Sequence, residues 1–168
     1  MTVLETGRLA LRRIIPDDAP FILELLNEPS FLEFIGDKGV RNLDDARRYI
    51  LTGPVASYER FGFGLYLVLL KAGDTPIGMC GLVKRETLPD VDVGYALRPA
   101  YWRQGYAFEA ASAVLTHGRE AFGLRRIVAI TSPGNAGSKA LLEKLGLRFE
   151  QALSLPGSGD IHLFAVEM

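Results

Sequence analysis

The chain has 168 residues, which is close to the size of one domain and predicts a single domain over residues 1–168. A hydrophobic fraction of 48% is typical of a packed globule and argues against a disordered chain. Lys plus Arg (19) nearly balance Asp plus Glu (20), so the net charge is −1. That balance argues against bulk binding to nucleic acid or to a membrane surface.

The cysteine content and the lengths of the apolar runs indicate where in the cell the chain is expected to lie. Cys80 is the only cysteine, which rules out an internal disulfide and fits a reducing compartment. No apolar run reaches the roughly 20 residues of a membrane-spanning helix. The N-terminal residues lack the basic start and apolar centre of a signal peptide. We therefore expect a cytoplasmic protein.

The first third of the chain alternates extended and helical patterns. Residues 4–15 are extended in character, and Pro16 to Asp18 end this segment. A helix is predicted next, with its apolar side chains between residues 21 and 26. Residues 30–40 form an ambiguous apolar flap. Asn42 then caps a helix through Ile50, which Gly53 and Pro54 interrupt before a second piece reaches Arg60.

Strand formers dominate the middle of the chain. Residues 64–70 and 76–83 predict a hairpin, because a turn composition separates them. Val91 to Leu97 alternate apolar and small or polar residues, which predicts the next strand.

The last third contains two further helices. A helix with apolar residues at helical spacing follows Gly105 and ends at Gly123. Residues 127–131 predict a buried strand, and a second helix follows Asn135. Two last strands complete the chain, which predicts a mixed α/β sheet.

The turn between the strand at 91–97 and the following helix is the first candidate site. Arg103, Gln104, Gly105, Tyr106 and Ala107 lie where that helix begins. The first turn of a helix has unpaired N–H groups and favours negative charge, and a glycine lets a ligand approach the backbone closely. These features suit a phosphate or pyrophosphate. The alternative at this point is a packing turn that binds nothing.

The second candidate is the helix start at Asn135 to Ser138. Asn135 is expected to cap its own helix. If the two strands that precede these helices are neighbours, both helix starts open on one edge of the sheet, where ligands bind in open α/β sheets.

Glu86 is the third candidate, because it follows an apolar strand and could act as a general base. A solvated rim is the alternative, and Asp90 and Asp92 compete for the role. His117 lies in the polar sector of its predicted helix and is expected to be exposed. His117, His162 and Cys80 have no metal-ligand spacing, so no metal is expected.

Several motifs together resemble the GNAT superfamily of acetyl-CoA-dependent N-acetyltransferases, and most of all its RimJ/RimL-like branch. The motifs are Glu5-Thr-Gly-Arg-Leu9, Tyr101-Trp-Arg-Gln-Gly-Tyr-Ala107 and Asn135-x-x-Ser138, with Glu143-Lys-Leu-Gly146 after them. The resemblance implies a central, mostly antiparallel sheet of about seven strands with about four helices. It also implies a cofactor cleft between two splayed parallel strands.

The resemblance further implies how acetyl-CoA would be held. The backbone N–H groups of residues 103–107 would bind the pyrophosphate. Ala96 and Leu97 would pair with the pantetheine arm like an added strand, and Asn135 would bond to that arm. An N–H near Tyr95 would polarise the thioester carbonyl.

One departure from the superfamily affects the acid. Many members have a tyrosine seven residues after the motif Asn, where this chain has Leu142. The resemblance to the RimL-like branch makes Ser138, or a water, the acid candidate, with Glu86 as the base.

The sequence thus predicts direct acetyl transfer to a primary amine, either a protein N-terminal α-amine or a small-molecule amine. An α-amine titrates near 8 and a lysine amine near 10.4, which favours an α-amino or small-amine acceptor. The alternative is a non-catalytic acyl-CoA-binding sensor or interaction module. We expect no nucleic-acid or membrane partner, and the oligomeric state stays open, with a homodimer as one option.

Overall fold

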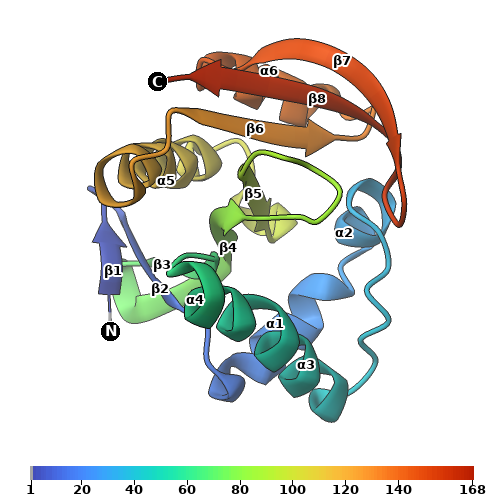
Figure 1. Cartoon of the computed structure of the whole chain (residues 1–168). Coiled ribbons are helices and arrows are strands. Elements are labelled where there is room, and N and C mark those ends of the chain that lie inside the picture. Colours follow the sequence, from blue (N-terminus) through green and yellow to red (C-terminus); the bar gives the residue numbers. More distant parts are fainter. Residues whose placement is uncertain (1) are drawn as a thin grey trace.

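An eight-stranded mixed sheet organises residues 2–168, which the computed structural model describes (Figure 1). Its strand order is β1-β2-β3-β4-β5-β6-β8-β7, and β5–β6 is the parallel pair among antiparallel neighbours. The mixed, mostly antiparallel α/β sheet predicted from the sequence is confirmed, with eight strands where about seven were expected. The strands are β1 Thr2–Glu5, β2 Leu9–Arg13, β3 Leu65–Leu70, β4 Thr75–Val83, β5 Asp92–Leu97, β6 Arg126–Thr131, β7 Arg148–Leu155 and β8 Gly159–Glu167.

The N-terminal segment forms two strands, so the expectation of one extended segment over residues 4–15 is wrong in part. A tight turn separates β1 from β2, and the Thr6 amide donates to the Leu9 carbonyl across it at 2.9 Å. The two strands pair antiparallel at the edge of the sheet. The turn brings Arg8 beside the start of a helix more than 90 residues later.

One face of the sheet is covered by helices from the first third of the chain. These are α1 Ala19–Leu26, α2 Pro29–Phe34 and α3 Leu43–Ile50. The next helix, α4 Ala56–Phe61, packs its Tyr58 into the core cluster that contains α5. Side chains of α1 and α3 pack on Leu67 and Met79 of the sheet. Asn42 caps α3 as predicted, because its Oδ1 accepts the Asp45 amide at 2.8 Å.

Gly53 and Pro54 interrupt the α-helical pattern as predicted, because α3 ends at Ile50 and a second piece, α4, contains Arg60. Residues Leu51–Val55 form a wide π-helical turn that leads directly into α4. The wider hydrogen-bonding pattern accommodates a proline that has no N–H to donate.

The opposite face carries α5 Tyr106–Phe122, with α6 Ala136–Lys144 beside it. Ala110, Ala111 and Val114 of α5 are fully buried against the sheet. These small side chains let the first half of α5 lie close to β4 and β5. Gly123 ends α5 in a left-handed conformation, φ 65°, as the sequence predicted.

The sheet divides at β5 and β6, and this split positions the site. Their register contains a single pair, Asp92 with Val128, next to a 3.0 Å bond from the Val128 amide to the Val91 carbonyl. Figure 1 shows β6, β8 and β7 forming one half of the molecule and β1 to β4 the other, with β5 between them. The cleft between splayed parallel strands that the resemblance implied lies at this split.

None of the helices between Thr2 and Met168 is both long and apolar enough to cross a membrane.

Candidate functional site

A cavity of about 1180 Å³ opens where β5 and β6 diverge. Its lining includes Tyr106 and Ser138 from the starts of α5 and α6. It also includes Tyr49 of α3 and Arg85 of the loop after β4. Residues from both faces of the sheet thus line one space, which is larger than the roughly 300–1,000 Å³ of most small-molecule sites.

The alternation of side chains along β5 divides this space into two sides. Val93 and Leu97 are buried in the core cluster that contains α5, and Tyr95 packs against the same cluster. Ala96 packs against the cluster formed by α1 and α3. We refer below to the α5 side and the α3 side of the cavity, which meet at the β5–β6 split.

On the α5 side, the turn before α5 adopts the geometry of an anion-binding loop. Arg103 has φ 60° and Gly105 has φ 83°, both in the left-handed region. Such alternation turns successive backbone N–H groups toward one point, at the positive end of a 17-residue helix. Arg103, Gly105, Tyr106 and Ala107 line the cavity, whereas Gln104 does not.

Gln104 helps to hold the loop in place. Its side-chain amide donates to the Ala100 carbonyl at 3.0 Å, and its backbone carbonyl accepts a hydrogen bond from Arg8 Nη1 at 3.0 Å. The Arg8 guanidinium also lies 4.2 Å from the centre of the Tyr106 ring. The turn between β1 and β2 therefore supports the anion loop from outside the cavity.

Glu109 in the first turn of α5 completes this support. It accepts the Arg8 amide at 2.9 Å, Arg8 Nε at 2.8 Å and the Thr6 hydroxyl. Burial acts to raise the pKa of Glu109, but these hydrogen bonds together lower it below the usual value. Sequence reasoning did not assign roles to Thr6, Arg8 and Glu109. The sequence contains both motifs to which these residues belong, but the motifs lie about a hundred residues apart and no local pattern shows that they are in contact.

The exposed edge of β5 faces the split between the strands. Arg98 donates its amide to Ile77 of β4, and Val91 accepts the Val128 amide of β6. Because main-chain groups alternate along a strand, the even-numbered residues of β5 bond toward β4 and the odd-numbered ones toward the cleft.

This alternation bears on the two residues expected to pair with a ligand arm. It directs the main chain of Leu97 to the cleft and that of Ala96 to β4, where Ala96 is in register with Met79. The Leu97 carbonyl already accepts the indole Nε1 of Trp102 at 2.8 Å. The N–H groups of Tyr95 and Leu97 are therefore the ones that face the split.

The start of α6 brings two hydroxyl groups together. Asn135 Oδ1 accepts the Ser138 amide at 3.1 Å, so Asn135 caps α6 as predicted, and both residues line the cavity. Ser138 Oγ lies 2.8 Å from Tyr95 Oη. Burial raises the pKa of Tyr95 to about 12, although the hydrogen bond with Ser138 opposes the shift. Tyr95 thus keeps its proton at neutral pH. Leu142 is fully buried in the core.

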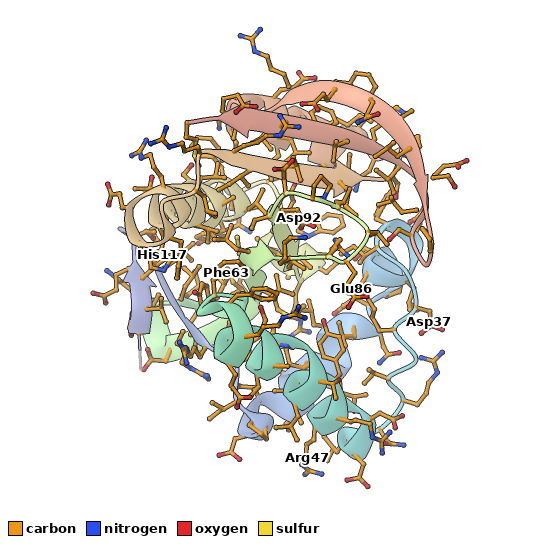
Figure 2. The ribbon with its side chains drawn as sticks, in the orientation of Figure 1. Asp37, Arg47, Phe63, Glu86, Asp92 and His117 are labelled. Carbon is orange, nitrogen blue, oxygen red and sulfur yellow. The ribbon has the colours of Figure 1, made fainter. Side chains whose placement is uncertain are left out.

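The carboxylates considered from sequence separate into different environments. Glu86 is exposed in the loop between β4 and β5, and it is not among the cavity-lining residues (Figure 2). Asp90 pairs with Arg126 at 3.0 Å. Asp92 is buried, with 1% of its surface exposed, and pairs with Arg85 at 2.7 Å. The sequence did not indicate Arg85 as a site residue.

Comparison with known proteins identifies the family. The model of the "Acetyltransferase (GNAT) domain" matches residues 8–148, which is most of the chain. The chain belongs to the GNAT acetyltransferase family. It is 31% identical over 153 residues to "Uncharacterized N-acetyltransferase YoaA" of Bacillus subtilis, a match that spans 90% of this chain and 85% of the relative. A second relative from that organism, "Uncharacterized N-acetyltransferase YnaD", is 29% identical over 88% of this chain and 83% of its own.

Solved structures agree with this family assignment. The acetyltransferase from Agrobacterium tumefaciens superposes with a TM-score of 0.84 at 25% identity, over 98% of this chain and 94% of that one. A ribosomal L7/L12 α-N-protein acetyltransferase, RimL, in complex with coenzyme A gives a TM-score of 0.86 at 17% identity, over 100% and 98% of the two chains. The second likeness concerns the fold alone. The resemblance to GNAT acetyltransferases read from the motifs is confirmed, and the protein is an acetyltransferase enzyme.

Proposed function

We propose that this protein transfers an acetyl group from acetyl-CoA directly to a primary amine, without a covalent acyl-enzyme. The observation that carries this proposal is the convergence of an anion-binding loop and a hydroxyl pair on one cavity. The loop is formed by Arg103 to Ala107, and the pair is Tyr95 with Ser138.

The coenzyme would lie on the α5 side of the cavity. Its pyrophosphate would accept hydrogen bonds from the backbone N–H groups at Arg103 to Ala107, with the charge of Arg103 close by. The pantetheine arm would run along the exposed edge of β5, and the backbone N–H of Leu97, rather than that of Ala96, would donate a hydrogen bond to it. Asn135 lines the same space, so its amide group could bond to the arm while its oxygen caps α6.

The thioester carbonyl would be polarised by the N–H of Tyr95, which the strand alternation directs into the split. An N–H donor fixed in a strand needs little reorganisation when charge develops on that oxygen. The amine nitrogen would attack the carbonyl carbon, and the C–S bond would break to release the thiolate of CoA.

Ser138 is the proposed proton donor to that thiolate. Its hydroxyl lies on the cavity wall and is held by the phenol of Tyr95 at 2.8 Å. Because burial raises the pKa of Tyr95 to about 12, its phenol stays protonated at neutral pH. The phenol can therefore orient the Ser138 hydroxyl and return a proton to Ser138 after the transfer. We assign Tyr95 as a positioning residue for this step.

The amine must lose a proton before it can attack. An α-amine with a pKa near 8 is partly neutral at physiological pH, so a distant base acting through water is sufficient. Glu86 is our candidate for this base, and its exposed position requires a bridging water. Glu86→Gln should lower kcat more at low pH than at high pH, and an identical pH–rate profile would remove Glu86 from the mechanism.

The acceptor class is the finer part of the proposal. A RimJ/RimL-like activity on a protein N-terminus is supported by the branch-specific motifs and by the structural likeness to RimL, which itself acts on ribosomal L7/L12. A small-molecule amine fits the same chemistry. Release of CoA over a panel of peptides and small amines would separate the two.

The direct-transfer step has a simple test at the single cysteine. Cys80 is fully buried in β4, and burial raises the pKa of its thiol to about 12, so it is a poor nucleophile. Cys80→Ala should therefore keep acceptor-dependent CoA release. Loss of turnover in a folded Cys80→Ala protein that still binds acetyl-CoA would contradict direct transfer.

A further inference from the structure

Three proton donors from three separate segments line the α3 side of the cavity. Lys38 belongs to the loop after α2, Tyr49 to α3 and Arg85 to the loop after β4. None of them belongs to the coenzyme loop or to the Tyr95–Ser138 pair. Their position on the opposite face of the sheet from α5 is where an acceptor would approach a thioester held at the split.

Arg85 is oriented by protein but keeps its terminal nitrogens free. Its Nε donates to the buried carboxylate of Asp92 at 2.7 Å, which fixes the plane of the guanidinium. Within residues 2–168, neither Nη nitrogen of Arg85 has a hydrogen-bond partner, and a third of the side chain is exposed. A guanidinium anchored through Nε presents its remaining N–H groups as a fork suited to an oxyanion.

Lys38 adds a second positive charge that no protein carboxylate neutralises. In the described part of the chain, no carboxylate lies within ion-pairing distance of its ammonium. Lys38 as a whole is an exposed residue, but partial burial of its ammonium and the nearby charge of Arg85 both lower its pKa. Lys38 and Arg85 both line the cavity, so both side chains can attract an anion bound there.

Neighbouring acidic groups are engaged elsewhere or lie out of reach. Asp37 pairs with Arg41 at 2.5 Å, and Glu28 is 3.5 Å from Arg98. Glu33 also lines the cavity, but it forms no ion pair with Lys38. Asp92 compensates the charge of Arg85, whereas Lys38 forms no ion pair in the described part of the chain.

Tyr49 supplies a third donor next to Arg85. No hydrogen bond within residues 2–168 uses its hydroxyl, and no buried side-chain polar atom in that part of the chain lacks a partner. The hydroxyl is therefore accessible, and Tyr49 is one of the cavity-lining residues. Burial raises the pKa of Tyr49, with the charge of Arg85 opposing the shift, so the phenol remains a donor at neutral pH.

We propose that Lys38, Tyr49 and Arg85 form an oxyanion subsite that selects an acceptor carrying a carboxylate as well as its amine. The inference rests on the proposed acetyl transfer and names the substrate class of that same cavity. A carboxylate matches the planar fork of Arg85, while Lys38 and Tyr49 can bond to its outer lone pairs.

Paired acceptors test this subsite directly. Glycine, β-alanine, 4-aminobutyrate and 6-aminohexanoate are each compared with the corresponding primary amide, together with C-terminally amidated Ala-Glu and Ala-Gln. CoA release gives kcat/KM, and rates are compared at equal concentrations of neutral amine, because an amide lowers the amine pKa of the short members. We expect at least one acid to exceed its amide roughly 10- to 100-fold, the size of one charge-assisted hydrogen bond.

The variants assign that preference to the subsite. Lys38→Gln should reduce the acid-to-amide ratio toward one. Arg85→Gln is combined with Asp92→Asn, because Arg85→Gln alone would leave a buried carboxylate without a partner. The matched control is Arg47→Gln, which removes the same charge from an exposed site on α3 outside the cavity (Figure 2) and should keep the wild-type ratio.

The failures of the two proposals are distinguishable. Equal turnover of acids and amides by the wild type would overturn the subsite and leave amine acetylation standing. A preference for phosphoethanolamine over every carboxylate would overturn the assignment of a carboxylate. A preference that survives in the Lys38 variant and in the double variant would place carboxylate recognition elsewhere. If the protein binds acetyl-CoA but acetylates no amine in the panel, both the proposed function and the subsite are contradicted.

Discussion

Gly105 offers a sharp test of the anion loop, because the same fold contains a matched control. Gly105 has φ 83° at the start of α5, and Gly123 has φ 65° at its end. A Cβ at Gly105 would lie 3.2 Å from the flexible tip of Arg8, and a Cβ at Gly123 would meet nothing within 4 Å. Backbone strain, rather than a clash, should therefore dominate both substitutions to alanine.

The left-handed conformation costs a non-glycine residue about 1–2 kcal/mol. For a chain of this size that strain should lower Tm by about 2–8 °C in both Gly105→Ala and Gly123→Ala. Only Gly105→Ala should also weaken acetyl-CoA binding, by up to about 5- to 30-fold, because any strain that the free loop relaxes must be restored on binding.

Isothermal titration calorimetry with acetyl-CoA and thermal unfolding measure the two effects separately. Gly123→Ala should match wild-type affinity while sharing the loss of Tm. Equal acetyl-CoA affinity in the two variants would refute the assignment of this loop to the pyrophosphate.

Three further predictions test the Tyr95–Ser138 pair, the support of the loop before α5 by Glu109, and the acid sensitivity of the fold. Tyr95→Phe should lower kcat about 10-fold with little change in KM for acetyl-CoA, and Ser138→Ala should lower it about 100-fold, within the range of general acid catalysis; wild-type kcat in both would exclude the pair from proton transfer. Glu109→Gln should weaken acetyl-CoA binding by about 0.5–1 kcal/mol, a modest change because the Arg8 side chain is 47% exposed. An unchanged affinity in calorimetry would mean that the loop holds its shape without this contact. Burial lowers the pKa of His117 below 6.5, with the charge of Glu120 opposing the shift. The imidazole therefore binds a proton more readily in the unfolded chain, so stability falls as pH drops below 6.5. His117→Phe should flatten the fall of Tm between about pH 7 and 5, and an unchanged slope would assign the acid sensitivity to other groups.

His117 also shows where a sequence pattern was a weak guide. Its position on the polar sector of α5 indicated an exposed side chain. In the fold it is half-buried, with its ring 5.1 Å from that of Phe122 and 6.4 Å from that of Tyr66. Helical periodicity locates the face of a residue, but the width of the buried stripe depends on which side chains of the sheet reach it.

The sequence by itself determined the features that depend on short-range backbone physics. Asn42 and Asn135 each cap the helix that follows by accepting the amide three residues ahead. Gly105 and Gly123 occupy left-handed positions at the two ends of α5. These outcomes follow from the unpaired groups at helix ends and from glycine's tolerance of positive φ. The likeness to GNAT acetyltransferases was also predictable, because short motifs in the sequence carry it.

Only the tertiary structure decided which of these features meet. The bond from Thr6 to Glu109 joins residues 103 apart in sequence, and Tyr95 meets Ser138 across 43 residues. Arg85 was not recognisable as a site residue, because its orientation depends on a carboxylate buried at the start of the next strand. Such contacts arise from the packing of whole elements around the β5–β6 split, where the strands part after a single register pair. A local pattern can show that a group is able to bind, but the fold sets which groups face the same cavity.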